Sequence, residues 1–152
     1  MQVEPFLIEP HRARDRTRIL ELLQQADLPV DDLQAGGAPV DFLVMRELGQ
    51  VVGAVGLQSA DGAGLLRSLV VLPLLHRQGR GAALVGAVER LAARRGMDDL
   101  YLLTTTVPGF FALLDYLRVD RATVPLALQR TSQFASLCPQ TAVCMHKRLR
   151  PN

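Results

Sequence analysis

The sequence contains no tryptophan, and aromatic residues make up only 5% of its 152 positions. Its two cysteines, Cys138 and Cys144, are too few for a disulfide framework, so we expect a reduced, cytoplasmic setting. No apolar run approaches the roughly 20 residues that a membrane-spanning helix needs. The N-terminal segment has no basic stretch ahead of an apolar one, so we expect no signal peptide. The composition therefore gives no indication of a membrane or secreted protein.

The net charge is small as well. The formal charge is +2, and the arginines are scattered along the chain rather than gathered in one segment. This distribution argues against a nucleic-acid surface. Apolar residues make up 49% and charged residues 21%, as in ordinary globular proteins. We therefore predict one compact domain over residues 1–152, with partners that are neither nucleic acids nor membranes.

Strand and helix patterns alternate along the chain. Apolar segments predict strands within residues 3–8, 41–48, 51–58, 64–73, 100–106 and 142–149. Helical spacing predicts helices within residues 12–26, 81–95, 109–117 and part of 124–133. The second and third strand segments are separated by a short turn, which indicates a hairpin. Residues 64–73 are almost all apolar, which is typical of a central strand covered on both faces.

Two glycines lie between the apolar segment that ends at Pro73 and the next helix. Gly79 and Gly81 flank Arg80, and Arg77 lies just ahead. A helix N-terminus has unpaired N–H groups and a partial positive charge, and glycine lets an anion approach the backbone. The arrangement is typical of a phosphate cradle, although it is neither a Walker loop nor a dinucleotide fingerprint. On these residues alone, an ordinary strand-to-helix turn is an equal alternative.

Residues 66–96 resemble the core motif of the GCN5-related N-acetyltransferases, the GNAT family. In that family strand four ends in Leu-x-Val-x-Pro, here residues 69–73. A pyrophosphate loop Gln/Arg-x-x-Gly-x-Gly/Ala follows, here residues 76–81, with His76 in place of Gln or Arg. The resemblance implies an α/β (α+β) fold with a mixed, mostly antiparallel sheet of about six to seven strands. Helices flank this sheet, which is splayed between strands four and five.

The same resemblance implies how the protein works. Acetyl-CoA lies between the splayed strands, its pantetheine arm pairs with the backbone around Leu69 and Val71, and an amine attacks the thioester directly. The implied partners are acetyl-CoA and a small amine, with no metal, and a homodimer is left open. The implied cofactor-binding residues are Leu69, Val70, Val71, His76, Arg77, Gln78, Gly79, Arg80, Gly81 and Ala82.

The acid that usually protonates the leaving thiolate is missing. Many members of the family carry a tyrosine on the helix after strand five, where this sequence has Phe111. Tyr116 would lie about 140° further around a helix, so we predict that it packs in the core. The asparagine often found after strand five is also replaced, by the threonines at 104–106. Thr104 and Thr105 are therefore the candidate catalytic residues.

Two finer resemblances concern the acceptor. Residues 100–119 are similar to N-acetylglutamate-synthase-type acetyltransferases, which act on α-amino acids. Residues 136–149, together with 28–33 and 65–71, are similar to acetyltransferases found with arsenic-resistance genes. These likenesses imply a small acceptor with an amino-acid-like head, for which an organoarsenical amine is a candidate.

Arg67 lies in an otherwise apolar strand and needs an anionic partner if it is buried. Two interpretations stay open: an ion pair with an acid such as Asp41 or Glu47, or a clamp for an acidic group on the acceptor. Asp31 and Asp32 lie in the loop that usually borders the acceptor pocket in the family. We name Asp32 as a candidate contact, with helix capping as the ordinary alternative.

The cysteines allow one further class of function. Cys138 lies in the connection before the last strand and is a candidate acceptor contact, whereas Cys144 lies within that strand and is expected to pack. Two alternatives to an enzyme stay open. One is a CoA-binding module without catalysis, consistent with Phe111, and the other is an arsenic- or metalloid-binding protein that uses its cysteines.

Overall fold

The computed structural model describes residues 6–33, 39–137 and 141–149 of the chain. Its strands form one sheet with the order β1-β2-β3-β4-β5-β7-β6. All neighbouring strands are antiparallel except β4 and β5, which are parallel. The predicted mixed, mostly antiparallel sheet is confirmed. The strands are β1 Leu7–Pro10, β2 Asp41–Glu47, β3 Gln50–Ala60, β4 Ala63–Val71, β5 Asp99–Thr104, β6 Leu117–Arg118 and β7 Val143–Arg148.

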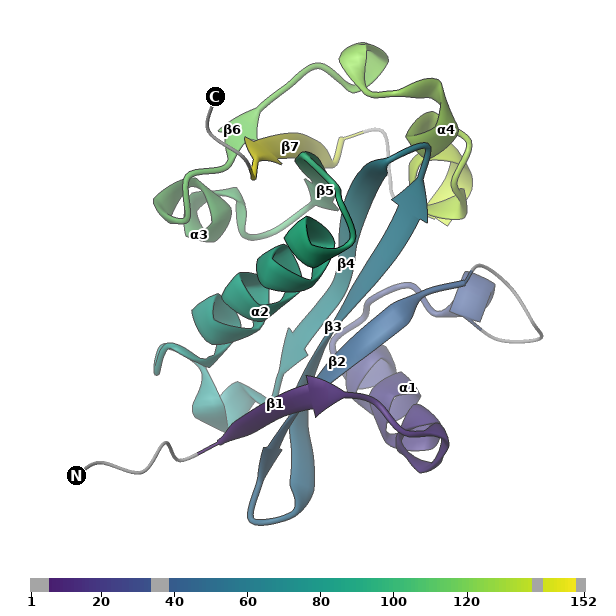
Figure 1. The fold of residues 1–152 in the computed structure, drawn as a ribbon. Coiled ribbons are helices and arrows are strands. Elements are labelled where there is room, and N and C mark those ends of the chain that lie inside the picture. The colour runs from purple at the N-terminus through teal and green to yellow at the C-terminus, as the bar shows by residue number, and fades with distance from the viewer. Residues whose placement is uncertain (1–5, 34–38, 138–140, 150–152) are drawn as a thin grey trace.

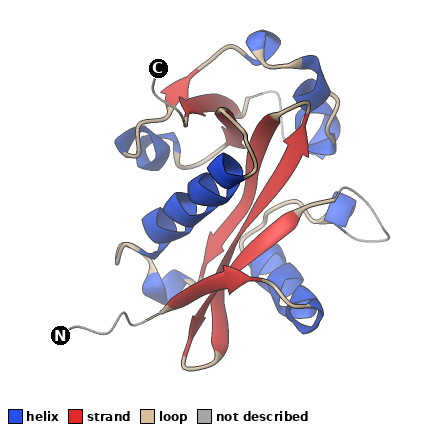
Figure 2. Ribbon diagram, in the orientation of Figure 1, coloured by secondary structure: helices blue, strands red, loops and turns tan. Residues whose placement is uncertain are grey.

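The two longest helices cover opposite faces of the sheet. In Figure 1, α2 lies in front of the central strands and α1 lies behind them, and Figure 2 shows the same layers by type of element. The helices are α1 Arg16–Gln25, α2 Arg80–Arg94, α3 Pro108–Leu113 and α4 Leu126–Gln129. Short 3-10 turns at Ala13–Asp15, Asp31–Leu33, Pro73–Leu75 and Arg121–Thr123 and a π-helical turn at Gln133–Leu137 join them. Within the described ranges, no helix has the length and apolar character needed to cross a bilayer.

The predicted helix over 109–117 is wrong at its C-terminal end. α3 stops at Leu113, and Asp115 adopts a left-handed conformation with φ 74°. The Tyr116 amide then bonds back to the Phe111 carbonyl at 3.1 Å, which closes the helix. Residues 117 and 118 consequently leave the helix and form β6, which pairs with β7.

The core explains why β4 is almost wholly apolar. On one face, Leu84 and Val88 of α2 are fully buried against the sheet, as the helical pattern predicted. On the other face, Leu22 and Leu23 of α1 belong to one apolar cluster with Val70 of β4 and with residues of β2 and β3. Full burial of a leucine side chain contributes about 2 kcal/mol. β4 therefore lies between two apolar layers, as expected of a central strand.

The sheet opens between β4 and β5. These strands pair only at Gly64–Leu100 and Leu65–Tyr101, and then diverge. An added Cβ at Gly64 would lie 2.9 Å from a Leu100 side-chain carbon, so glycine permits the close approach at the vertex. Further along β4, Ser68 has φ 58° and the register with β3 shifts, which marks a bulge. This geometry confirms the predicted splay and creates the site described next.

Candidate active site

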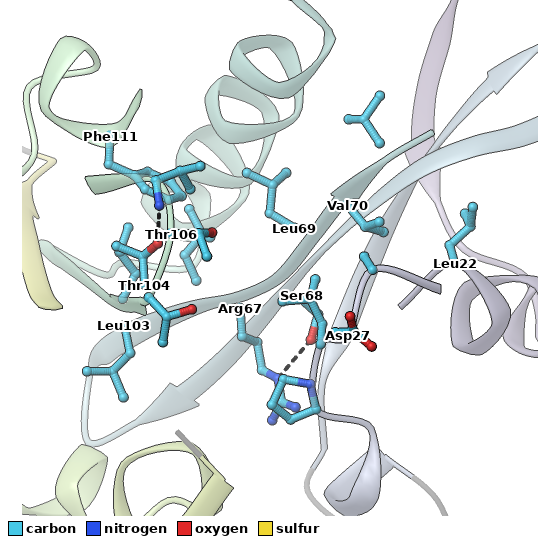
Figure 3. Close-up of a pocket in the computed structure, with 18 of the residues that line it drawn as sticks. Leu22, Asp27, Arg67, Ser68, Leu69, Val70, Leu103, Thr104, Thr106 and Phe111 are labelled. Carbon is cyan, nitrogen blue, oxygen red and sulfur yellow. Dashed lines mark hydrogen bonds between the residues drawn. The ribbon is translucent and has the colours of Figure 1, made fainter. Parts of the chain in front are cut away.

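A cleft of about 550 Å³ opens where β4 and β5 diverge. Residues 66–71 of β4 form one wall, and residues 102–107 with Phe111 of α3 form the second. Residues 25–29, at the end of α1, form the third (Figure 3). No strand in the described part of the chain pairs with the β5-facing edge of residues 66–71. The three strand residues predicted to bind the cofactor, at 69–71, therefore line an open cleft.

The N-terminus of α2 offers backbone donors beside this cleft. Gly79 caps the helix with φ 82°, a left-handed conformation that strains any residue with a side chain. The Ala83 amide bonds to the Gly79 carbonyl at 3.0 Å. The amides of residues 80–82 have no partner within the helix, and the helix dipole is positive at this end. The predicted loop is thus shaped as an anion cradle.

The two arginines of the loop differ in burial and in bonding. Arg80 is buried and donates from Nε and Nη2 to the Glu47 carboxylate, each at 2.7 Å, and from Nη1 to Gln78 Oε1 at 2.6 Å. Hydrogen bonding within this pair lowers the pKa of Glu47 and raises the pKa of Arg80. Arg77 is exposed, and no described residue bonds to its side chain. Of the two predicted charges, only Arg77 is free to meet an anion.

His76, which replaces the family's Gln or Arg, lies against the end of β4. Its Nε2 is 2.7 Å from the Val71 carbonyl oxygen. The His76 ring therefore already contacts a backbone carbonyl of β4 that the family resemblance assigned to the pantetheine arm. Leu69, the other strand position named for that arm, lines the cleft.

Arg67 is completely buried and fully engaged. Its Nη1 and Nη2 donate to the two carboxylate oxygens of Asp32 at 2.5 and 2.7 Å. Nη1 also donates to Gln58 Oε1 at 3.0 Å, and Nε donates to Ser68 Oγ at 3.2 Å. Of the two interpretations left open, the ion pair is present. Asp32 does not line the cleft, and its link to the cleft is its ion pair with Arg67, which does.

The acids named as partners for Arg67 were wrong. Asp41 pairs with Arg95, and Glu47 pairs with Arg80. Arg67 instead faces the side of the sheet that the turn Asp31–Leu33 covers, which brings Asp32 to it. Sequence separation alone could not show which acid lies opposite a buried arginine.

The threonines and Phe111 line the second wall. Thr104 is buried, and its Oγ1 accepts a hydrogen bond from the Val107 amide at 3.2 Å, whereas Thr105 is exposed. Phe111 is 4% exposed, with its ring 5.0 Å from that of Phe110 in an edge-to-face contact. The described lining of the cleft contains no tyrosine hydroxyl.

Tyr116 packs in the core, as predicted. Its side chain is 1% exposed, and its hydroxyl donates to Glu89 Oε2 at 2.9 Å. Burial raises the pKa of Tyr116. It therefore does not supply the acid that Phe111 lacks.

The sequence matches the Acetyltransferase (GNAT) family over residues 7–118. The chain belongs to this acetyltransferase family. No curated protein sequence gave a match.

Solved structures share the fold of this chain. N-acetylglutamate synthase from Neisseria gonorrhoeae, complexed with coenzyme A and N-acetyl-glutamate, matches with a TM-score of 0.78 and 16% identity over 99% of this chain and 36% of its own. A GNAT-family acetyltransferase from Staphylococcus aureus Mu50 gives 0.77 and 15% over 95% and 99% of the two chains. Rv2747 from Mycobacterium tuberculosis, in complex with CoA and NLQ, gives 0.78 and 20% over 95% and 99%. The chain thus spans about a third of the synthase, and identities this low show the fold alone.

The structure describes only one of the two cysteines. Cys138 lies outside the described residues. Cys144 is unpaired and 3% exposed, which confirms its packing role. Burial raises the pKa of its thiol to about 11, so the thiol stays protonated at neutral pH. Among the described residues, no group of His, Cys, Asp and Glu side chains is arranged to hold a metal ion.

One cleft residue was missed by the sequence analysis. Asp27 follows α1 with φ 58°, lines the cleft, and accepts no bond at its carboxylate from any described residue. No sequence pattern marks it. The helix dipole opposes an acid at this position, and the left-handed φ, which usually favours Gly or Asn, is visible only in the structure.

Proposed function

We propose that this chain is an acetyl-CoA-dependent N-acetyltransferase that moves an acetyl group to the amine of a small acceptor. One observation carries the proposal: the cleft between the diverging β4 and β5 opens beside the Gly79-capped start of α2. A thioester donor with a pyrophosphate needs both an anion cradle and an extended groove. Membership of the acetyltransferase family and the CoA-bound relatives of the same fold support this donor.

The donor's pyrophosphate would meet the amides of residues 80–82 and the charge of Arg77. Gly79 keeps the approach open, because no side chain projects from it. The pantetheine arm would lie along the β5-facing edge of β4 near Leu69. Residues 76 and 78 shape the loop through their bonds to Val71 and Arg80.

Chemistry in the cleft would proceed by direct attack of the amine on the thioester carbonyl. Acetyl-CoA supplies the activated acetyl group, and the protein holds the reactants together, an effect worth roughly 7–11 kcal/mol in favourable cases. Backbone N–H groups along the unpaired edge of β4 can stabilise the developing oxyanion. Because Phe111 has no proton to give, water or a hydroxyl of Thr104 or Thr105 would assist the departing thiolate.

The acceptor is proposed to be small and amino-acid-like. This part rests on the sequence likeness of residues 100–119 to enzymes that act on α-amino acids, and on the printed ligand of the N-acetylglutamate synthase structure. The proposed acceptor wall includes Arg67 with its partner Asp32, while Cys138 stays a sequence-based candidate. An amine-bearing organoarsenical remains one acceptor to test, because residues 136–149 are similar to arsenic-associated acetyltransferases. A single domain in the cytoplasm is part of the same proposal.

A CoA-binding module without catalysis is the second candidate. Phe111 favours it, because the usual proton donor is absent. Both candidates predict CoA binding, so binding alone does not separate them. Amine-dependent consumption of the thioester does.

The test is release of free CoA thiol from acetyl-CoA with a panel of amines. The panel contains free amino acids, amino-acid amides, diamines and an amine-bearing organoarsenical. Thiol release that depends on both the protein and an amine supports the enzyme. Tight CoA binding by calorimetry without thiol release from any amine would support the binding module instead.

A further inference from the structure

The charged and titratable side chains that line the cleft differ in whether another described residue bonds to them. The charged or titratable side chains of the lining are those of Asp27, Arg67 and His76. Arg67 is paired with Asp32, and the His76 ring contacts a backbone carbonyl. Among the described lining residues, the Asp27 carboxylate is therefore the one carboxylate or guanidinium without a bonded partner. The free charge that an acceptor would meet is negative.

The ion pair with Asp32 neutralises the charge of Arg67 and occupies its donors. The two side chains are 0% and 6% exposed, so neither is open to a ligand. Both terminal nitrogens of Arg67 already donate to the Asp32 carboxylate. An acceptor carboxylate would have to displace Asp32 from a buried ion pair, and breaking such pairs is strongly unfavourable. This wall of the cleft therefore does not attract an acidic group.

Asp27 is solvent-exposed and lies in a turn that suits other residues better. It follows the last turn of α1, where the helix dipole is negative, and its φ of 58° suits Gly or Asn better. The Leu28 amide bonds back to the Leu23 carbonyl at 2.9 Å, so the turn itself is well formed. Figure 3 shows Asp27 and Ser68 among the side chains that line the cleft. Local conflicts of this kind concentrate at functional sites.

We propose that Asp27 binds the positive charge of the acceptor, which is a cationic amine without an acidic group facing Arg67. Where the bound ammonium is itself the reacting group, it first loses a proton to water, and the neutral amine then attacks the thioester. Amino-acid amides and diamines belong to this class, and acidic amino acids do not. The inference rests on the proposed function and departs from it in one respect: the amino-acid-like acceptor carries an amide or a second amine in place of the carboxylate. Asp27 selects the acceptor through its negative charge, while Asp32 excludes carboxylates by holding Arg67.

The test compares amines that differ in one charge: L-alaninamide with L-alanine, and 1,4-diaminobutane with 4-aminobutyrate. Specificity is measured as kcat/KM from thiol release, calculated per concentration of neutral amine, because only the neutral amine attacks and the paired compounds differ in amine basicity. We expect the amide and the diamine to be favoured about tenfold or more, the typical value of a charge-assisted contact. Asp27→Asn should raise KM for the favoured amine about tenfold and raise the melting temperature, because Asn suits the left-handed turn.

Asp61→Asn is the matched control, because Asp61 also has a left-handed φ, of 50°, but lies outside the cleft. It should leave KM unchanged. Asp32→Asn should free Arg67 and shift the preference toward the acidic member of each pair. If this variant does not fold, the inference is tested by the wild-type comparison of the paired amines and by Asp27→Asn. Preference of the wild type for the acidic members, or an unchanged KM in Asp27→Asn, would overturn this inference alone. No thiol release with any amine would overturn the proposed function, and this inference with it.

Discussion

Arg80 and Glu47 join the start of α2 to the end of β2. Nε and Nη2 of the guanidinium donate to the two carboxylate oxygens, each at 2.7 Å. Since Arg80 is the first residue of α2 and Glu47 the last of β2, the pair orients the helix N-terminus on the sheet. The Arg80 side chain therefore positions the anion cradle, and Arg77 carries the free charge.

We expect the two arginines to respond differently to substitution. Arg77→Met should weaken CoA binding up to about tenfold at low salt, because one charged contact to phosphate is lost, and the difference should shrink as salt rises. Arg80→Met should lower the melting temperature, because Glu47 loses its partner. Calorimetric titration with CoA and thermal unfolding measure the two effects. A salt-independent loss of affinity in Arg77→Met would contradict a phosphate contact.

Gly79 and Gly96 form a matched pair at opposite ends of α2. Their φ values are 82° and 81°, and an added Cβ would meet no atom within 4 Å at either position. Alanine at each should therefore cost a similar 1–2 kcal/mol, roughly the penalty of the left-handed backbone. Only Gly79→Ala should also weaken CoA binding, since only Gly79 borders the cradle. Equal CoA affinity in the two variants would argue against pyrophosphate binding at this loop.

Cys144 gives the protein an alkaline instability. Burial raises the pKa of its thiol from 9.0 to about 11. As the pH rises above 9.0, the thiol ionises first in the unfolded chain, so the stability contribution of the protonated thiol declines until the pH passes about 11. The pKa values of Tyr101 and Tyr116 are raised as well, so the comparison must be with Cys144→Ala, which removes only the thiol.

Denaturant unfolding of both proteins from pH 7 to 11 measures this difference. The stability of the wild type should fall more steeply than that of Cys144→Ala across the interval set by the two pKa values. Parallel pH profiles would mean that the thiol is not buried as the structure describes.

Much of the fold could be predicted because its patterns are local. The hairpin of β2 and β3, the apolar β4 and the start of α2 follow from apolar spacing and glycine positions. The end of α3 could not, because the left-handed turn at Asp115 and the pairing of β6 with β7 depend on the rest of the sheet. The helical pattern continued past this turn to Leu117, which tertiary contacts assign to a strand.

In the candidate site too, the features within a short sequence motif were predicted and the long-range contacts were not. The glycine cradle and the cleft-lining backbone of β4 were predicted from a contiguous motif. The partners of Arg67 and Arg80 were not, since they lie 35 and 33 residues away along the chain. Asp27 was missed because a single acid in a polar loop gives no pattern, and only the packed structure shows that its carboxylate lines the cleft.

The proposed direct attack predicts that no covalent acetyl-cysteine forms. Cys144 is buried and protonated, and the sequence around Cys138 offers no adjacent base. Cys138→Ser should therefore keep most of the activity. Intact mass spectrometry of the protein incubated with acetyl-CoA alone should show no added acetyl group. A stoichiometric adduct that an amine discharges would contradict the mechanism.

Transfer of a labelled acetyl group to an amine distinguishes an N-acetyltransferase from every alternative. The protein is incubated with deuterium-labelled acetyl-CoA and the amine that gives most thiol release, and the small molecules are analysed by mass spectrometry. We expect labelled acetyl on the amine nitrogen, in an amount equal to the free CoA formed. Label found only as free acetate, or an acetylated amine formed equally well without the protein, would contradict the proposed function.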